Sequence, residues 1–485
     1  MSNAAEVGAE KVVNLQYLLT EGDVIVFMGR QNELKKLDEL YNSGKFECVI
    51  VHGRLRVGKT ALLREFMKNK RSIYFAAQET SSRENLQNLV NLVKVFSREP
   101  ETQTQAQEIN SYTDVFNRIF WLTCSERVVL IIDDYELLAA SHRGISELIR
   151  GQVDQWFIES RLMLVICGSS EPVMERETLN YDSPFQGCRT AQIRLQPFTF
   201  FETRRYYTNF SPYDIAIIYG VTGGIPRYLE LMDPDLPIER NIRRAFFDTT
   251  SLLFEEPANI LRREVHEPGY FSAVLKAIAT GCNKISEIAA AVGLETNACT
   301  VYLKNLIALG FVGKHTPVTE KAGEKTIYEI EDSMFRFWYR FVPDNISLIQ
   351  SGMTDKIWRS VSSEISLFMH KVFEDICRQW VKLRNSAGRL PVEFAEVGRW
   401  WGIDPMLETD VAIPIVAYLD DSHALFGDCV WSDEQTGEDV LAALEDRSRL
   451  FRHPNRYLFL FSRSGFTDEC AALAQRIGAN LVMFE

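Results

Sequence analysis

The sequence predicts an α/β fold, and its 485 residues are long enough for about three domains. Short apolar runs alternate with helical stretches through the first half, as in a parallel sheet covered by helices on both faces. A glycine-rich loop joins the first apolar run to a helix, and a second α/β pattern closes the chain. The predicted divisions are residues 1–21, 22–235, 236–345 and 346–485.

The composition is that of an ordinary globular protein, with 46% hydrophobic and 25% charged residues. A net charge of −13 disfavours non-specific binding of nucleic acid or membrane by the whole chain. Nine cysteines without a C-x-x-C pair predict reduced, mostly buried thiols in a cytoplasmic protein. No apolar run approaches about 20 residues, so no membrane span is predicted. The first 21 residues are expected to be a flexible N-terminus.

The first predicted domain contains a phosphate loop. After a short apolar run come Gly53 and then Gly58, Lys59 and Thr60, in the pattern G-x-x-x-x-G-K-T that opens a helix. Glycine lets the backbone N–H groups curl toward phosphates, while Lys59 adds a charge and Thr60 a hydroxyl for Mg²⁺. The residues expected to bind the nucleotide here are Gly53, Arg54, Leu55, Arg56, Val57, Gly58, Lys59, Thr60 and Ala61.

A second apolar run, residues 128–132, ends in two acids and resembles a Walker B motif. Asp133 stands at the predicted strand tip, where it is placed to hold Mg²⁺ together with Thr60. In such motifs the next residue is usually Glu and orients the attacking water, whereas Asp134 is one methylene shorter. Because such a group depends on its position at the ångström level, slow hydrolysis is predicted. Glu136 is a second candidate for this role.

Six segments in this order resemble the archaeal-type ATPase family, which is related to the AAA+ and STAND ATPases. The resemblance implies that Ser169 reads the γ-phosphate or the water, unless it merely ends a strand. It also implies that Pro226 lies in a lid turn on the adenine and that Arg227 is a sensor arginine, or else a surface charge. One arginine of the family is Cys188 here, so any arginine-finger role rests on Arg189. The segments are residues 29–34, 53–60, 132–134, 167–170, 187–190 and 223–229.

The middle division, residues 236–345, is expected to hold lid helices and a domain that resembles a winged helix. Three amphipathic helices are followed by two short strands, the order of elements in that fold. Residues 265–345 carry eight Lys/Arg against nine Asp/Glu, whereas a duplex reader normally needs several spare cations. DNA binding and a packing or partner-binding role therefore both stay open.

The last division resembles the PD-(D/E)XK nuclease fold. That resemblance implies a metal site formed by Glu374, Asp410 and Asp428, but the position of the required lysine is Val430. We therefore expect an inactive nuclease fold, in which the strand acids bind a metal weakly or are simply solvated. Residues 398–402, with the sequence GRWWG, resemble the domain usually appended to this ATPase family.

Together these patterns predict a protein that binds ATP and Mg²⁺ and hydrolyses ATP slowly as a nucleotide-controlled switch, with Asp134, Ser169 and Arg189 as catalytic candidates. The alternative is an ATP-regulated DNA-binding protein or nuclease that uses the winged helix and the last domain. A scaffold that binds nucleotide without hydrolysis is a third reading. The expected partners are the nucleotide, DNA through the winged helix, and a protein partner or a second copy, with no membrane.

Overall fold

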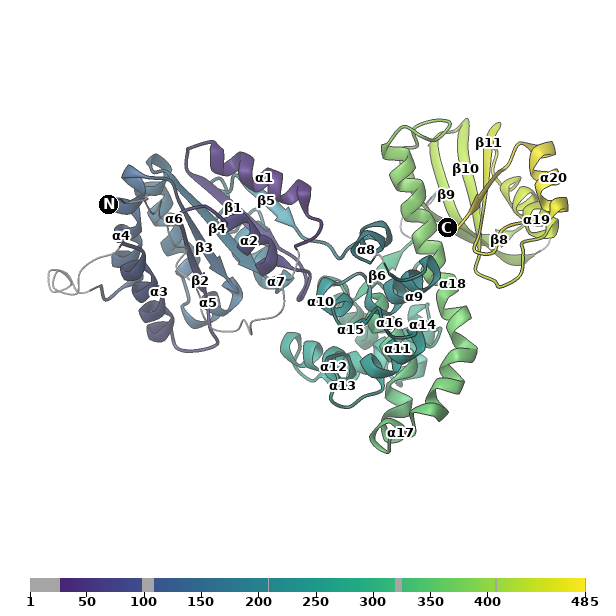
Figure 1. Cartoon of the computed structure of the whole chain (residues 1–485), viewed down its shortest axis with the longest axis horizontal. Helices are drawn as coiled ribbons and strands as arrows, with labels where there is room; N and C mark the ends of the chain where they lie inside the picture. Colours follow the sequence, from purple (N-terminus) through teal and green to yellow (C-terminus); the bar gives the residue numbers. More distant parts are fainter. Residues whose placement is uncertain (1–26, 98–108, 208, 319–324, 406–407, 485) are drawn as a thin grey trace, which may run out of the picture. The chain divides into compact units, whose positions relative to one another are not determined.

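The computed structural model describes residues 27–97, 109–207, 209–318, 325–405 and 408–484 (Figure 1). These residues divide into two compact units, one ending at Gln196 and one beginning at Pro197. The predicted ATPase domain, residues 22–235, includes a segment from Pro197 onward that lies in the second unit. The N-terminal stretch that was expected to be flexible lies outside the described residues. Among the described residues, no helix is both long and apolar enough to cross a membrane.

The first unit is built on a parallel five-stranded sheet with the order β2-β3-β4-β1-β5. Its central strands β1, β3 and β4 are buried along their whole length, which explains why they read as continuous apolar runs. This sheet confirms the predicted α/β fold. The strands are β1 (Glu47–His52), β2 (Ser72–Ala76), β3 (Val128–Asp133), β4 (Leu162–Gly168) and β5 (Ala191–Arg194).

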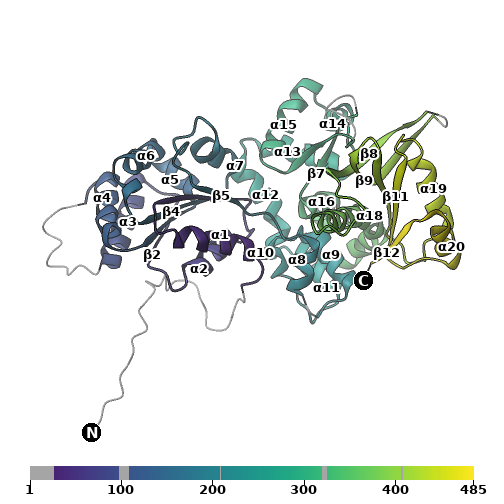
Figure 2. The same cartoon turned by 90° about the horizontal axis from the view of Figure 1, so that it is seen from above.

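Helices cover both faces of this sheet (Figures 1 and 2). One core lies between the sheet and α3 to α6, and a second lies between the sheet and α1 and α2. Alternate strand residues serve the two cores: Cys48 and Ile50 face the first, and Val49 and Val51 face the second. The helices are α1 (Gln31–Asn42), α2 (Lys59–Met67), α3 (Ser82–Ser97), α4 (Tyr112–Ser125), α5 (Tyr135–Ser141), α6 (Ile145–Gln155) and α7 (Glu171–Met174), with short turns of helix at Phe157–Glu159 and Glu175–Leu179.

The second unit begins with helices and a two-stranded antiparallel hairpin. Helices α13, α14 and α15 are followed by β6 and β7, which is the order of elements predicted for a winged helix. The assignment to that fold stays a prediction. The elements are α8 (Phe200–Tyr206), α9 (Pro212–Thr222), α10 (Pro226–Leu229), α11 (Ile238–Phe246), α12 (Leu252–Glu264), α13 (Pro268–Ala279), α14 (Ile285–Val292), α15 (Thr296–Ala308), β6 (Val312–His315), β7 (Ile327–Ile330), α16 (Ser333–Phe341), the turn Pro343–Asn345, α17 (Ile346–Gln350) and α18 (Thr354–Ser386).

A second five-stranded sheet closes the chain, in the order β12-β11-β10-β9-β8. Strands β8, β9 and β10 pair antiparallel, while β10, β11 and β12 pair parallel. The long helix α18 packs on β8, β9 and β10, and α19 and α20 share a separate core with the sheet. The elements are β8 (Glu396–Asp404), β9 (Thr409–Asp420), β10 (His423–Val430), α19 (Glu438–Ser448), β11 (Asn455–Ser462), α20 (Asp468–Ile477) and β12 (Asn480–Met483).

Two glycines form the turn between α9 and α10. Gly223 and Gly224 have φ of 64° and 68°, in the left-handed region that glycine tolerates best. A Cβ on Gly224 would lie 2.1 Å from the carbonyl oxygen of Phe198. The backbone N–H of Phe198 also donates to the Gly224 carbonyl at 2.8 Å. The close contact is therefore between two backbone segments, and no flexible side chain can move aside to relieve it.

The substitution Gly224→Ala should therefore destabilise the second unit. The left-handed backbone alone costs alanine about 1 kcal/mol, and the backbone clash adds about 1–3 kcal/mol. Gly352→Ala is the matched control, because Gly352 has φ of 73° but open space around its Cβ position. Urea unfolding followed by tryptophan fluorescence should give a clearly lower midpoint for Gly224→Ala than for Gly352→Ala. Equal midpoints would contradict this role for the turn.

Candidate nucleotide-binding site

The predicted phosphate loop connects β1 to α2 at the carboxyl edge of the first sheet. Its backbone curls through φ values of 146° at Gly53, 67° at Arg56 and 93° at Gly58. A Cβ on Gly53 would lie 2.3 Å from the carbonyl oxygen of Leu195, so a side chain does not fit there. The conformation thus explains both glycines of the motif and places the N-terminus of α2 at the end of the loop.

Lys59 is the first residue of α2 and is buried. Its ammonium group donates to the carbonyl oxygens of Gly53 at 2.7 Å and Arg54 at 2.9 Å, on the opposite side of the loop. Burial lowers the pKa of Lys59, and the nearby charge of Asp133 opposes this effect. An anion inside the loop would stabilise the charged ammonium of Lys59 more strongly than the carbonyl dipoles of Gly53 and Arg54 do.

Thr60 and Asp133, the two residues predicted to hold a metal, are in direct contact. The Thr60 hydroxyl donates to Oδ2 of Asp133 at 2.9 Å, and the hydroxyl of Tyr74 donates to the same oxygen at 2.7 Å. The other carboxylate oxygen accepts from the backbone N–H of Asp134 at 3.0 Å. Tyr74 lies on β2, beside β3, and the sequence analysis did not identify it, because nothing in the apolar pattern of β2 marks a partner of Asp133.

The tips of β3 and β4 are joined by Glu136. This side chain is buried, and both of its carboxylate oxygens accept from the backbone N–H of Ser169, at 3.1 and 3.2 Å. Asp134 instead occupies the N-cap of α5 with φ of 52° and is partly exposed. Two of the predicted catalytic residues, Asp134 and Ser169, therefore follow neighbouring strands. Glu136 positions Ser169 by binding its backbone N–H.

Arg189, the third catalytic candidate, lies just before β5. Its guanidinium donates to the carbonyl oxygens of Thr178 at 2.8 Å and Leu179 at 3.0 Å, so in this arrangement it braces its own unit. Pro226 and Arg227 belong to the second unit and begin α10. Arg227 is exposed and pairs with Glu230 at 2.7 Å, the arrangement of an ordinary surface charge.

Arg30 braces the phosphate loop, a role that the sequence analysis did not anticipate. It has φ of 60° and is buried, and its guanidinium donates to the carbonyl oxygens of Val57 at 3.2 Å and Gln196 at 2.5 Å. Val57 belongs to the loop, and Gln196 is the last residue of the first unit. The sequence does not reveal this role, because Arg30 lies far from Val57 and Gln196 in the chain.

Two of the predicted nuclease acids are paired with cations, and the third is exposed. Asp428 pairs with Arg447 of α19 at 2.5 Å, and Glu374 on α18 contacts Lys371 at 3.3 Å. Asp410 is exposed near the start of β9. Within the described part of the chain, no group of three His, Cys, Asp or Glu side chains is placed to hold a metal ion. Arg447 was missed because its pairing depends on how α19 packs on the sheet.

Cys188, next to Arg189, is partly exposed and has an unusual environment. The neighbouring Cys48 thiol and the Arg150 guanidinium lower the pKa of Cys188 to about 7, against the opposing effect of burial. Because the thiolate is the reactive form, Cys188 should be alkylated faster than an ordinary cysteine at neutral pH.

The rate of Cys188 alkylation by iodoacetamide, followed by peptide mass spectrometry, should therefore inflect near pH 7. Arg150→Gln removes a cation that stabilises the thiolate, so the inflection should move to higher pH. Cys188→Ser identifies the peptide. An inflection at the ordinary thiol pKa of about 8.5 in the unmodified chain would show that this environment is not as described.

Two family models match this chain. One, described as an ATPase domain predominantly from Archaea, matches residues 27–232. The other, described as archaeal and bacterial proteins of unknown function, matches residues 338–440. The first match spans the described sheet and the phosphate loop, so the predicted resemblance to archaeal-type ATPases is confirmed. The nuclease-like and winged-helix assignments remain predictions.

Two proteins of one archaeon are similar to this chain in sequence. An uncharacterised protein of Methanocaldococcus jannaschii is 28% identical over 410 residues, which are 84% of this chain and 88% of that protein. An uncharacterised ATP-binding protein of the same organism is 40% identical over 48 residues, 10% of this chain and 81% of that protein.

Solved structures also align with this chain. The Walker-type ATPase of Pyrococcus abyssi aligns over 64% of this chain and 96% of its own, with 20% identity and a TM-score of 0.49. The ORC2 protein of Aeropyrum pernix, solved with ADPNP and ADP, aligns over 70% and 97%, with 15% identity and a TM-score of 0.45. At these TM-scores, the fold assignment rests on the strand order of this chain itself.

Proposed function

We propose that this chain is a slow, Mg²⁺-dependent ATPase in which ATP binding controls a conformational switch. Residues 27–232 match a family model described as an ATPase domain predominantly from Archaea. The observation that carries the proposal is the buried ammonium of Lys59, which donates to two carbonyl oxygens of a curled loop. Phosphate oxygens are better partners for such a charge than carbonyl dipoles. The nucleotide-binding residues of the first unit would be Gly53 to Ala61.

The donor atoms around Asp133 fit Mg²⁺. This ion prefers hard oxygen ligands and commonly keeps several waters, so it needs few protein groups. Thr60 Oγ1 and the Asp133 carboxylate would hold it, and Tyr74 keeps the carboxylate in place. When bound, Mg²⁺ neutralises charge on the phosphates. The chain itself binds the phosphates through Lys59 and the loop backbone.

Hydrolysis is assigned to residues at the tips of β3 and β4. Asp134 would orient the attacking water, and Ser169 would contact the γ-phosphate or that water. Arg189 precedes β5, at the edge of the sheet opposite the phosphate loop, so it would supply charge only to a neighbouring copy. The short side chain of Asp134 and the carbonyl contacts of Arg189 both support slow turnover. Glu136 would act as a positioning residue, because it fixes the backbone of Ser169.

A switch needs a connection from the loop to the rest of the chain. Arg30 provides one, because its guanidinium binds both Val57 of the loop and Gln196, where the first unit ends. A ligand that shifts the loop backbone would therefore shift a partner of Arg30 and, through it, the segment that leads into the second unit. This connection supports the switch over a scaffold that only binds nucleotide.

Lys59→Ala should abolish most of the ATPase activity. Loss of a positioned charge at the reacting group typically costs about 100-fold or more in rate, so phosphate release should fall by at least that factor. Lys36→Ala is the matched control, since Lys36 is an exposed lysine on α1. Equal phosphate release from Lys59→Ala and the unmodified chain would remove the ATPase proposal.

The role of Asp134 is tested by lengthening its side chain. Asp134→Glu restores the usual reach toward the water and should raise kcat by about 10-fold, whereas Asp134→Asn should lower it by at least about 100-fold with little change in ATP affinity. Glu136→Gln keeps the length of the side chain and an oxygen that can accept from Ser169, but it removes the carboxylate. It therefore distinguishes a positioning role of Glu136 from a role in proton transfer. Full activity in Asp134→Asn would assign the water to another group.

DNA binding is the second candidate function, and it rests on the predicted winged helix. The exposed side chains of α15 include one cation, Lys304, among the polar residues Thr296, Asn297 and Asn305. Such a surface neutralises few phosphates. A DNA-binding function would require that the chain binds duplex DNA at low salt and that its affinity falls steeply as the salt concentration rises.

A further inference from the structure

The segment Gly398–Gly402 on β8 takes no part in the nucleotide site, yet it makes several contacts with the β6–β7 hairpin. The backbone N–H of Val318, which follows β6, donates to the Arg399 carbonyl at 2.9 Å. The indole N–H of Trp401 donates to the carbonyl of Lys325, which precedes β7, at 2.9 Å. Both sides of the hairpin therefore bind β8, the edge strand of the second sheet.

The side chain of Arg399 adds an ion pair to these contacts. It donates to both carboxylate oxygens of Glu329 on β7, at 2.8 and 2.5 Å. Burial alone would raise the pKa of Glu329, but Lys371 and Arg399 lower it to about 2, so the carboxylate stays charged at neutral pH. Paired two-point bonds of this kind are stronger and more specific than single contacts.

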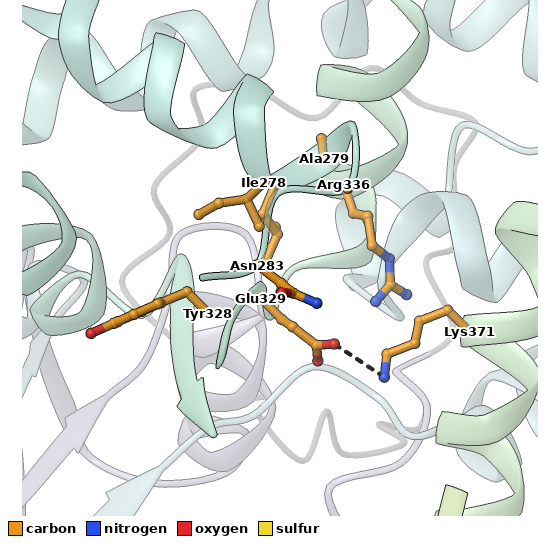
Figure 3. Close-up of a pocket in the computed structure, with 9 residues that line it drawn as sticks. Ile278, Ala279, Asn283, Tyr328, Glu329, Arg336 and Lys371 are labelled. Carbon is orange, nitrogen blue, oxygen red and sulfur yellow. Dashed lines mark ion pairs between the residues drawn. The ribbon is translucent and has the colours of Figure 1, made fainter. Parts of the chain in front are cut away.

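Lys371 of α18 holds the same carboxylate from another side, at 3.4 Å. Figure 3 shows this pair on the wall of a cavity of about 180 Å³, which Arg336 and Asn283 also line. Arg399 and Glu329 are only 15% and 25% exposed. Exposed ion pairs contribute little, whereas this partly shielded pair with a bidentate geometry contributes more.

Gly398 and Trp400 of the segment also favour its contact with the hairpin. A Cβ on Gly398 would lie 3.0 Å from the side chain of Val318, so glycine permits the close approach. Val318 packs against the core of the second sheet, which includes Trp400. The β8–β9 ladder shifts register between Gly398 and Trp400, and such irregularities re-aim the side chain between them, here Arg399.

We propose that Gly398–Gly402 is a docking site for the β6–β7 hairpin of the same chain. It joins α13–α15 and the second sheet into one body, with Glu329 and Val318 as the anchors on the hairpin. Docking also gives the Arg399 carbonyl, on the edge strand β8, a backbone hydrogen-bond partner. If α13–β7 is a winged helix, its wing is thereby held by the last domain, and a partner that uses the wing must displace Arg399 from Glu329.

The test is hydrogen–deuterium exchange of the full-length chain, read on peptides from β6 and β7. Arg399→Gln removes a two-point bond between charged groups, so exchange in these peptides should become at least about 10-fold faster. Arg449→Gln is the matched control, because it removes the same charge from an exposed pair in the same domain and should change nothing in the hairpin.

Peptides from α19 and α20 report whether the sheet stays folded in each variant. If Arg399→Gln also speeds exchange in α19 and α20, the second variant, Gly398→Val, is used instead. It keeps every charge and only crowds the side chain of Val318. Faster exchange confined to the hairpin in either variant supports docking. Unchanged hairpin exchange in a variant whose α19 and α20 remain protected would overturn the proposal.

Discussion

Lys59 imposes the constraint on which the candidate site depends. A buried ammonium needs acceptors around it, and here the loop itself supplies two carbonyl groups. This requirement fixes the curl of the loop, and the curl in turn requires glycine at Gly53, where Leu195 approaches too closely for a side chain. The same turn brings Thr60 against Asp133. One charge thus sets the positions of most of the groups that we assign to ATP and Mg²⁺.

The parts of this site that were predictable from sequence are those encoded locally. The phosphate loop and the acid-tipped strand are continuous segments, and a wholly buried parallel strand has an unmistakable apolar run. Tyr74, Arg30 and Glu136 were not predictable in their roles, because each depends on which strands or loops become neighbours in the folded sheet. The orientation of Glu136 toward Ser169 is set by the pairing of β3 with β4, which no local pattern reveals.

The second unit shows the same limit. Its helices and hairpin follow from amphipathic spacing, but the contact between Arg399 and Glu329 joins residues 70 positions apart in the sequence. The acids that the nuclease resemblance implied are separately paired with cations, Asp428 with Arg447 and Glu374 with Lys371. In this arrangement, the last domain contributes a binding surface for the hairpin on its edge strand, β8.

The central claim is that Lys59 exchanges its carbonyl partners for phosphate. A crystal structure of the full chain with Mg²⁺ and a non-hydrolysable ATP analogue measures this directly. The account predicts phosphate oxygens within hydrogen-bond distance of the Lys59 ammonium, in place of the carbonyls of Gly53 and Arg54, and the Thr60 hydroxyl turned from Asp133 toward the metal. A nucleotide bound elsewhere, or a Lys59 that keeps both carbonyl bonds beside bound nucleotide, would contradict it.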